Sequence, residues 1–386
     1  MSHSKLLRGL FTLAAVALTA TAAHSQIKIG VVLSTTGPAA SLGIPEQKTV
    51  ELFPKEIGGE KIQYIILDDA SDPTGAVKAT KKLIADDGVH AIIGATTTPS
   101  SLAMRDSLAE AGVPQISVAG GRSIVFPMDD KRRWVFNTAP STTLMATAIA
   151  NHMKAGGVKK AAYIGFDDAF GEDWATNFAE SAKAVGIEVV AAERYSRAAT
   201  SVTGQTLHIK AANPDAVMIG ASGTAAALPE RSFNQIGYKG KLYQSGGVAN
   251  PDFIRICGAD CNGTIVAAAP GLVAHQLPKD ASFKAAAMRY ADTYEGAYGK
   301  KTLTQFSANA WDSGVLLEHA IPVALRQAKP SDRKAFSAAL RDALEGLKNV
   351  PAAGGVYTMT PTEHNGLDEQ GVVLVEIVNG DWRLMK

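Results

Sequence analysis

From residue 26 onward, short runs of apolar and β-branched residues alternate with longer segments of helical length. The predicted strands are Ile27–Leu33, Gln63–Asp68, Ala91–Gly94, Gln115–Val118, Ala161–Gly165, Glu188–Ala192, Ala216–Gly220 and Lys241–Gln244. The predicted helices between them include Gly75–Asp87, Pro99–Ala111, Leu144–Ala155, Trp174–Val185 and Ala225–Gln235. Strands and helices that alternate in this way indicate parallel sheets covered by helices on both faces.

The alternation is interrupted by "GGRSIVFPMDDKRRW" (Gly120–Trp134) and begins again at Ala161. This break predicts an α/β protein with two doubly wound lobes, each of which would bind ligand beyond the carboxyl ends of its strands. The length of 386 residues also suits two domains better than one core. Within the break, Asp129–Trp134 mixes both charge signs and is interpreted as a surface loop.

The first 25 residues have the pattern of a secretory signal peptide. Lys5 and Arg8 precede the apolar stretch Leu10–Ala20, and Ala23-His24-Ser25 fits a cleavage site for signal peptidase. The apolar stretch is too short for a permanent membrane anchor. We therefore expect an exported, soluble protein that is cleaved near Ser25.

Charge and composition exclude some classes of partner. Apolar residues make up 46% of the chain and charged residues 19%, which is typical of a globular protein. The formal net charge is +1, and it becomes −1 without residues 1–25, which carry two basic residues and no acid. A nearly neutral chain without basic clusters gives no reason to expect a nucleic-acid partner.

Metal and thiol chemistry have few candidates. The acidic groups Asp68–Asp72 and Asp167–Asp173 lack the pattern of a calcium loop and are interpreted as helix caps and solvated turns, so no metal or cofactor is predicted. In an oxidising compartment the two cysteines, Cys257 and Cys261, are expected to form a local disulfide. The alternative, a metal site, lacks further ligands nearby in sequence.

The stretch "GATTTPSSLAM" (Gly94–Met104) joins a strand to a helix and is rich in hydroxyl groups. Pro99 suits the first position of the helix, with Thr98 as its N-cap, so the loop lies at a strand's carboxyl end beside a helix N-terminus. Free backbone N–H groups there favour an anion, and hydroxyl groups could add donors from Thr97, Thr98, Ser100 and Ser101. The alternative is a simple cap with solvated neighbours.

Two further loops at the same edge of the sheet favour a binding site over a simple cap. "STTGPAASLG" (Ser34–Gly43) follows the first strand, and "SVAGGRS" (Ser117–Ser123) follows the fourth. Carboxyl ends of parallel strands meet at one edge, so we expect the three loops to lie together. Together they predict a site for the carboxylate of a small molecule.

Four segments in order give the chain a family resemblance: "IKIGVVLSTTGPAASLG", "LDDASDPTGAVKATKKLI", "YIGFDDAFGEDW" and "FNQIGYKGKLYQSGG". With these motifs the chain resembles type I periplasmic solute-binding proteins of the branched-chain amino acid (Leu/Ile/Val-binding) family, which serve ABC transporters. The resemblance implies a periplasmic monomer without cofactor or catalysis, which delivers a small ligand to a membrane permease.

The resemblance also implies two lobes joined by three hinge crossings that close on the ligand. The crossings are expected near Pro140, Pro270 and Gly354. Lobe I would then comprise residues 26–140 and 270–354, and lobe II residues 141–269 and 355–386.

Site residues follow from the same resemblance. The carboxylate is expected at Thr97 and Thr98 and at Ala119, with backbone N–H groups from Gly120 and Gly121. The remaining walls of the cleft correspond to Leu42, Phe170, Ser222, Gly246 and Phe306.

One departure from the family pattern concerns the ligand's amine. Relatives that bind amino acids place an acidic residue at the position matching Gly246, but "YQSGGVA" and "FNTAPSTT" contain no acid. A buried ammonium without a carboxylate partner is unfavourable by several kcal/mol. We therefore expect a carboxylate without an amine, favouring an aromatic acid of the benzoate, phenylpyruvate or hydroxycinnamate kind over a 2-oxo acid or a short fatty acid.

The alternative is an amino-acid-binding protein in which a neighbouring acid, Asp167 or Asp252, reaches the cleft. An enzyme is a weaker candidate, because the chain has no H-E-x-x-H motif and no G-x-S-x-G elbow after a strand. A sensor ectodomain, which shares the implied fold, is a further alternative.

Overall fold

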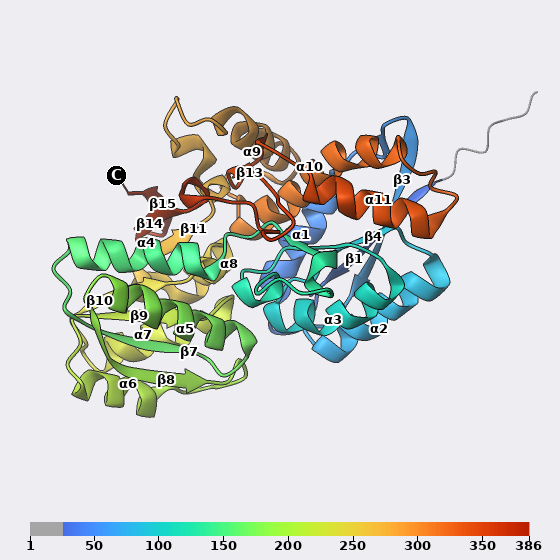
Figure 1. The fold of residues 1–386 in the computed structure, drawn as a ribbon. Coiled ribbons are helices and arrows are strands. Elements are labelled where there is room, and N and C mark those ends of the chain that lie inside the picture. Colours follow the sequence, from blue (N-terminus) through green and yellow to red (C-terminus); the bar gives the residue numbers. More distant parts are fainter. Residues whose placement is uncertain (1–25, 386) are drawn as a thin grey trace, which may run out of the picture.

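The computed structural model describes residues 26–385, which form two large sheets of mainly parallel strands with helices packed on their faces (Figure 1). A small antiparallel sheet of β12 Val350–Pro351 and β13 Val356–Tyr357 accompanies them. This arrangement confirms the predicted fold class of two α/β lobes. The predicted signal peptide, residues 1–25, lies outside the described residues.

The first sheet has the strand order β2-β3-β1-β4-β5-β6. Its strands are β1 Ile27–Leu33, β2 Glu56–Ile57, β3 Glu60–Asp68, β4 Ala91–Gly94, β5 Gln115–Ser117 and β6 Val135–Asn137, all parallel except β2. The helices of this lobe are α1 Ala40–Glu51, α2 Pro73–Lys82, α3 Thr98–Ala111, α9 Lys284–Tyr298, α10 Gln305–Leu325 and α11 Arg333–Glu345. The predicted helix Gly75–Asp87 corresponds to α2 and the π-helical turn Leu83–Asp87 that continues it.

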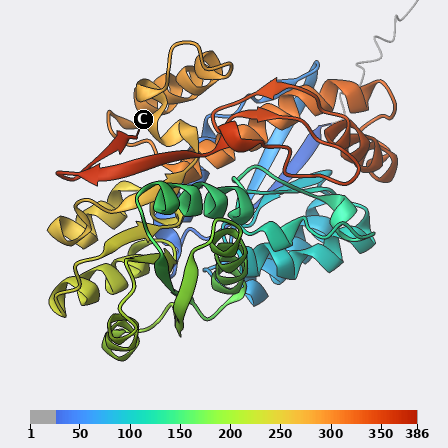
Figure 2. The same cartoon turned by 60° about the vertical axis from the view of Figure 1, so that its left-hand side comes forward.

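The second sheet has the order β15-β14-β11-β10-β9-β7-β8. Its strands are β7 Lys160–Phe166, β8 Glu188–Tyr195, β9 Ala216–Gly220, β10 Lys241–Gln244, β11 Ile265–Ala268, β14 Val373–Val378 and β15 Asp381–Leu384. β14 pairs antiparallel with both β11 and β15. Its helices are α4 Thr142–Ala155, α5 Ala169–Ala184, α6 Thr203–Ala211, α7 Ala227–Gln235 and α8 Pro251–Cys257. Figure 2 shows that β14 and β15, from the end of the chain, complete one edge of this sheet.

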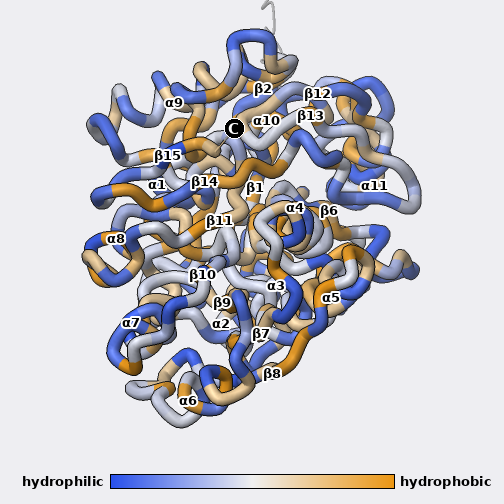
Figure 3. The backbone as a smooth tube through the Cα atoms, turned by 90° about the vertical axis from the view of Figure 1, so that its left-hand side faces the viewer, coloured by the Kyte–Doolittle hydropathy of each residue, from blue (hydrophilic) through white to orange (hydrophobic). Residues whose placement is uncertain are grey.

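Burial on both faces explains why the strands are apolar throughout. In β1, Ile27, Ile29, Val31 and Leu33 pack in one cluster with α10 and α11, and Val32 packs in the opposite cluster with α2 and α3. A parallel strand covered on both faces has no solvated side, so its sequence is a continuous hydrophobic run. Figure 3 shows such hydrophobic segments at β1 and β14, and a hydrophilic segment at the periphery near β2.

The strand order places a switch point in each sheet. In the first sheet the chain goes from β1 to β3 on one side and then to β4 on the other. In the second it goes from β7 to β8 on one side and then to β9 on the other. Loops at such a reversal diverge and leave a crevice beyond the carboxyl ends of the strands, which is where ligands of doubly wound sheets bind.

The chain passes between the sheets three times. It leaves the first sheet after β6, around Pro140, and returns after β11, around Pro270. The third crossing lies later than the predicted Gly354. Met359 still packs in the first core and Asn365 donates to the carbonyl of Ala139 at 2.7 Å, so residues up to about 367 stay with lobe I.

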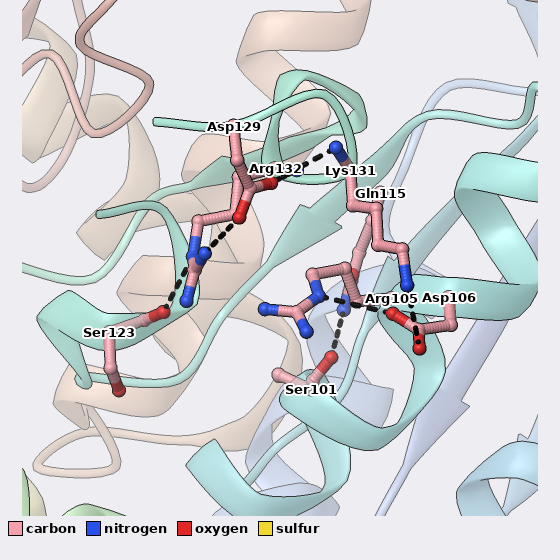
Figure 4. Close-up of polar contacts among 8 residues, drawn as sticks. All are labelled: Ser101, Arg105, Asp106, Gln115, Ser123, Asp129, Lys131 and Arg132. Atoms are coloured by element: carbon pink, nitrogen blue, oxygen red, sulfur yellow. Dashed lines mark hydrogen bonds and ion pairs between the residues drawn. The ribbon is translucent and has the colours of Figure 1, made fainter. Parts of the chain in front are cut away.

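The segment that interrupts the alternation is tied to α3 by charged groups (Figure 4). Arg132 pairs with Asp129, and its Nε donates to the carbonyl of Ser123 at 3.1 Å. Lys131 Nζ lies 3.0 Å from a carboxylate oxygen of Asp106, which is on α3. Asp129 and Lys131 are exposed, in keeping with the predicted surface loop, and these contacts anchor the loop to the helix that starts at the cleft.

The predicted disulfide is absent from the structure. Cys257 and Cys261 are free and buried. Cys257 ends α8, and Cys261 closes the 3₁₀ turn that follows, where its thiol donates to the carbonyl of Gly258 at 3.3 Å. The two thiols nevertheless lie next to each other, because a hydrogen bond with Cys261 is the main cause that raises the pKa of Cys257. No helix within residues 26–385 is long and apolar enough to cross a membrane.

A buried carboxyl group of α10 holds the segment beside the hinge. Asp312 accepts hydrogen bonds from the backbone N–H groups of Ala353 (2.7 Å) and Gly354 (2.8 Å) and from the hydroxyl of Tyr357 (2.8 Å). Burial nevertheless raises the pKa of Asp312 to about 7. The folded protein therefore binds a proton at this carboxyl group that the unfolded chain releases at lower pH.

This pKa predicts a pH-dependent term in stability. Because the pKa is raised on folding, the unfolding free energy from this group falls as pH increases from about 4 to about 7, and it is constant above that range. Asp312→Asn should remove this fall, which is on the order of a few kcal/mol. Urea denaturation between pH 4 and pH 8 measures it, with Asp86→Asn, at a carboxylate that is 67% exposed, as the control. Equal pH dependence in wild type and Asp312→Asn would contradict the prediction.

Candidate functional site

A cleft lies between the lobes, beyond the switch points of the two sheets, and the space that it encloses together with its opening to solvent is about 410 Å³. Lobe I contributes the loops after β1, β4 and β5, with Leu42, Thr96, Thr97, Thr98, Val118, Ala119 and Gly120. Lobe II contributes Met145, Phe170, Arg197, Ser222 and Gly247. The start of α10, with Gln305, Phe306 and Asn309, completes the lining.

Most of the predicted site residues lie around this cleft. Those that line it are Leu42, Thr97, Thr98, Ala119, Gly120, Phe170, Ser222 and Phe306. Gly246 and Gly121 do not. A Cβ on Gly246 would lie 2.5 Å from the side chain of Gln305, so this glycine packs against the start of α10, and Gly247 takes the place at the cleft wall.

Gly121 lies behind the wall because it packs against Thr98. A Cβ at Gly121 would come within 2.5 Å of the methyl group and 2.7 Å of the hydroxyl oxygen of Thr98. The glycine therefore allows the loop after β5 to approach the start of α3 closely.

The start of α3 differs by one residue from the prediction. The N-cap is Thr97, whose hydroxyl accepts from the backbone N–H of Ser100 at 3.4 Å, and Thr98 is the first helical residue with Pro99 second. The hydroxyl of Thr98 is consequently not used for capping. It is buried, lines the cleft, and has no hydrogen-bond partner among the described residues. A buried hydroxyl without a partner is unfavourable unless something binds it.

Two other hydroxyl groups of this stretch, those of Ser101 and Thr96, hold the protein together, whereas that of Ser100 also has no hydrogen-bond partner among the described residues. Ser101 accepts from the N–H of Ala95 at 3.1 Å, and its hydroxyl lies 2.9 Å from that of Ser117 on β5. Thr96 accepts from the N–H of Ser34 at 2.9 Å and donates to the carboxyl group of Glu46. These bonds fasten the loops after β1, β4 and β5 to one another.

Two buried carboxyl groups lie beneath this loop. Burial raises the pKa of Glu46 well above its usual value, against the lowering effect of the hydrogen bond from Thr96. Burial also raises the pKa of Asp69, which accepts from the hydroxyl of Ser34 at 2.7 Å. Both shifts favour the neutral acid, which limits negative charge below a loop whose N–H groups suit an anion.

The lobe II wall is built around the start of α5. Asp168 caps this helix by accepting from the N–H groups of Phe170 (2.9 Å) and Gly171 (3.1 Å). Its second oxygen pairs with Nε of Arg197, whose Nη1 donates to the hydroxyl of Ser222 at 3.0 Å. One aspartate therefore positions both the aromatic and the cationic side chain of this wall.

Apolar side chains from both lobes enclose the cleft. Ala39, Leu42 and Phe306 form a small buried cluster on one side. On the other, the ring of Phe170 would be 3.6 Å from a Cβ at Gly120, so the second lobe approaches the first closely there. Flat, apolar surfaces on both walls suit a planar or branched hydrocarbon group.

The charges around the cleft are unequal. Arg197 is the single charged residue in its described lining, which contains no Asp or Glu. Asp167 is exposed and outside the lining, and Asp252 pairs with Arg255 on the surface at 2.9 Å. Neither acid reaches the cleft, as the alternative of an amino-acid-binding protein required. Within residues 26–385 no group of three or more His, Cys, Asp or Glu side chains could hold a metal.

Several lining residues were not predicted from the sequence: Val118, Met145, Arg197, Gln305 and Asn309. Arg197 follows β8 by two residues, and this position after a strand's carboxyl end was a usable signal. Gln305 gave no signal, because its role depends on tertiary contacts. Its N–H donates to the carbonyl of Ala249 at 3.0 Å, and its side chain accepts from Ala269 N–H at 2.8 Å.

With this geometry in place, comparison with known proteins identifies the family. The profile of the family described as "periplasmic binding protein" matches residues 26–381. The chain belongs to this family. The match spans nearly all of the described residues and agrees with the predicted resemblance to the Leu/Ile/Val-binding type. The protein is thus a solute-binding component of the ABC-transporter type, and its family places it in the periplasm.

Individual relatives agree with this assignment. An extracellular ligand-binding receptor from Rhodopseudomonas palustris HaA2 is 43% identical, with a TM-score of 0.89 over 93% of this chain and 99% of that one. Leu/Ile/Val-binding protein BraC3 of Rhizobium johnstonii is 26% identical over 351 residues, which are 88% of this chain and 89% of that protein. An R. palustris ABC-transporter solute-binding protein in complex with 4-hydroxybenzoate shares the fold, with a TM-score of 0.76 at 22% identity over 94% and 95% of the two chains.

The contrast between Thr98 and Ser101 predicts opposite effects on stability. Thr98→Val removes a hydroxyl that has no partner and should leave the unfolding free energy unchanged or higher. Ser101→Ala leaves the buried N–H of Ala95 without its acceptor and should lower the unfolding free energy by about 1–3 kcal/mol. Urea denaturation of ligand-free protein measures both. A destabilised Thr98→Val would show that its hydroxyl has a structural partner.

Proposed function

We propose that this protein captures a small carboxylate without an amine, favouring an aromatic acid, and delivers it to the membrane permease of an ABC importer. The ligand would bind in the cleft between the lobes and stabilise their closed arrangement. The observation that carries the proposal is the lining of the cleft, which has hydrogen-bond donors on both walls and no acidic side chain.

The carboxylate would bind at the start of α3. The first N–H groups of a helix and the positive end of its dipole favour an anion. The hydroxyl of Thr98 is buried beside them without a partner and is free to donate to a carboxylate oxygen. Ala119 and Gly120, in the loop after β5 of the same lobe, add a second backbone segment to the lining.

The absence of an acid argues against an amino acid. An enclosed ammonium group needs a carboxylate or several acceptors to replace its water, and the one charged side chain present, Arg197, would repel it. This is the point at which the cleft differs from the family pattern for amino-acid ligands. The name of the Rhizobium relative indicates that it binds leucine, isoleucine and valine. Because the two chains are only 26% identical, we infer the ligand of this protein from its own cleft residues instead.

The remaining lining suits a hydrocarbon ring. Phe170, Phe306, Leu42, Met145 and Val118 provide aromatic and aliphatic surface around the cleft, as is usual for small-ligand sites. The R. palustris complex shows that a protein of this fold can enclose an aromatic carboxylate. This supports the ring as the favoured ligand class over a short fatty acid or a 2-oxo acid.

The proposal predicts which compounds stabilise the folded protein. Benzoate, phenylpyruvate and 4-hydroxycinnamate should raise the melting temperature, because a ligand at 100 times its Kd adds about 2.7 kcal/mol to the unfolding free energy. Leucine at the same concentration should leave it unchanged. A thermal-shift series followed by calorimetry measures both. Tight binding of leucine with no binding of the three acids would refute the proposal.

The hydroxyl of Thr98 should contribute to binding although it contributes nothing to folding. Thr98→Val should weaken the affinity for aromatic acids about tenfold or more, the usual loss for a hydrogen bond to a charged group. The matched control is Thr203→Val, which removes the hydroxyl of another threonine at a first helical position, exposed and outside the cleft. Unchanged affinity in Thr98→Val, measured by calorimetry, would remove Thr98 from the site.

A further inference from the structure

The carboxyl group of Asp173 joins the two lobes at a point outside the lining of the cleft. Asp173 is on α5 of lobe II, three residues after Phe170, which does line the cleft. Its Oδ2 accepts from the backbone N–H of Arg122 at 2.7 Å, and Arg122 begins a 3₁₀ turn of lobe I. A carboxyl group of one lobe is thus hydrogen-bonded to the main chain of the other.

The turn that donates this hydrogen bond is packed into lobe I. Its apolar side chains are buried in a cluster with the loop after β5 and the start of β6, which comprises Ala119, Ile124, Val125 and Val135. Leu102 of α3 packs against this cluster. The turn therefore moves together with the loop after β5, part of which lines the cleft.

The acceptor is held in place within lobe II. Thr142, the first residue of α4, is buried and donates its hydroxyl hydrogen to Oδ2 of Asp173 at 2.5 Å. Its own hydroxyl oxygen lies 3.3 Å from the N–H of Arg122, so both acceptors of this N–H belong to lobe II. Because the carboxyl group is oriented by its own lobe, little conformational entropy is lost when it accepts from the other lobe.

Contacts across the cleft show that the lobes are closed in this structure. A Cβ at Gly223 of lobe II would be 3.0 Å from Leu42 of lobe I, and a Cβ at Gly120 of lobe I would be 3.6 Å from the ring of Phe170. The hydrogen bond between Arg122 and Asp173 is therefore a bond of the closed arrangement. A bond made only in one of two arrangements shifts the equilibrium towards it.

We infer that Asp173 is a positioning residue for ligand capture, because its carboxylate holds the loop after β5 against lobe II and stabilises the closed arrangement without contacting the ligand. Separation of the lobes breaks this bond, so it slows release of the ligand. The inference rests on closure of the lobes around a ligand, which is part of the proposed function. It applies to a carboxylate and to an amino acid alike.

The experiment measures association and dissociation rates by stopped-flow fluorescence, with whichever of benzoate, phenylpyruvate, 4-hydroxycinnamate and leucine binds wild type. Asp173→Ala should raise the dissociation rate about tenfold, the usual effect of losing a hydrogen bond to a charged group. The association rate should stay within twofold of wild type, since the ligand enters the open arrangement, in which the bond is not made.

Arg122→Pro removes the donor of the same bond. Proline has no N–H and is tolerated at the first position of a helical turn, which Arg122 occupies. The preceding Gly121 has extended dihedral angles (φ −75°, ψ 128°), which suit a residue before proline. Arg122→Pro should raise the dissociation rate as much as Asp173→Ala does. The double variant should raise it no further, because both substitutions remove one interaction.

Two further variants separate this bond from other effects. Arg122→Ala removes the guanidinium but keeps the backbone N–H, so its dissociation rate should rise much less than that of Arg122→Pro. The matched control is Glu172→Gln, at the neighbouring carboxylate of α5, which pairs with Arg194 inside lobe II. Its dissociation rate should stay within twofold of wild type.

Three results would overturn the inference. An unchanged dissociation rate in Asp173→Ala or in Arg122→Pro would show that the bond does not hold the lobes closed, and either variant decides this if the other folds poorly. Additive effects in the double variant would show that the two groups act independently. A lower association rate with unchanged dissociation would place the role of Asp173 in the open protein. Binding of leucine alone would instead refute the proposed function, and leucine would then provide the same test of Asp173.

Discussion

An anion enclosed between two lobes must exchange its water shell for hydrogen-bond donors that the protein already holds in place. In this structure the donors come from the start of α3 and from the hydroxyl of Thr98, which is buried without another partner. The hydroxyls of Thr98 and Ser100 are both unpaired, but of these two residues only Thr98 lines the cleft, and the hydroxyl of Ser101 is bonded. Most buried polar groups in proteins are hydrogen-bonded, so an unpaired hydroxyl that lines a cleft indicates a candidate ligand contact.

The fold explains why these donors face a second wall. Each sheet reverses its strand order once, between β1 and β4 in lobe I and between β7 and β9 in lobe II. The loops after these strands supply Thr96–Thr98 on one side and Phe170 and Ser222 on the other. Specificity can then change through loop residues while the buried strands stay the same.

Much of the fold was predictable, because buried parallel strands such as Ile27–Leu33 leave an unbroken apolar run in the sequence. The loop that we propose for the carboxylate was recognised from its hydroxyls and Pro99, but the cap was placed one residue late, since Pro99 occupies the second helical position here rather than the first. The third hinge crossing was placed too early because the segment around Met359 packs in lobe I through contacts distant in sequence. Arg197 was missed although its position after a strand was a usable signal, and its contact with Ser222, 25 residues later in the sequence, is visible only in the fold.

The central claim is that the cleft accepts a carboxylate and rejects an ammonium group. The most direct measurement compares 3-phenylpropanoate with phenylalanine by calorimetry, since the two differ only in the α-ammonium group. The account predicts that 3-phenylpropanoate binds at least a hundredfold more tightly, which corresponds to a difference of about 2.7 kcal/mol. Equal affinity, or tighter binding of phenylalanine, would contradict it.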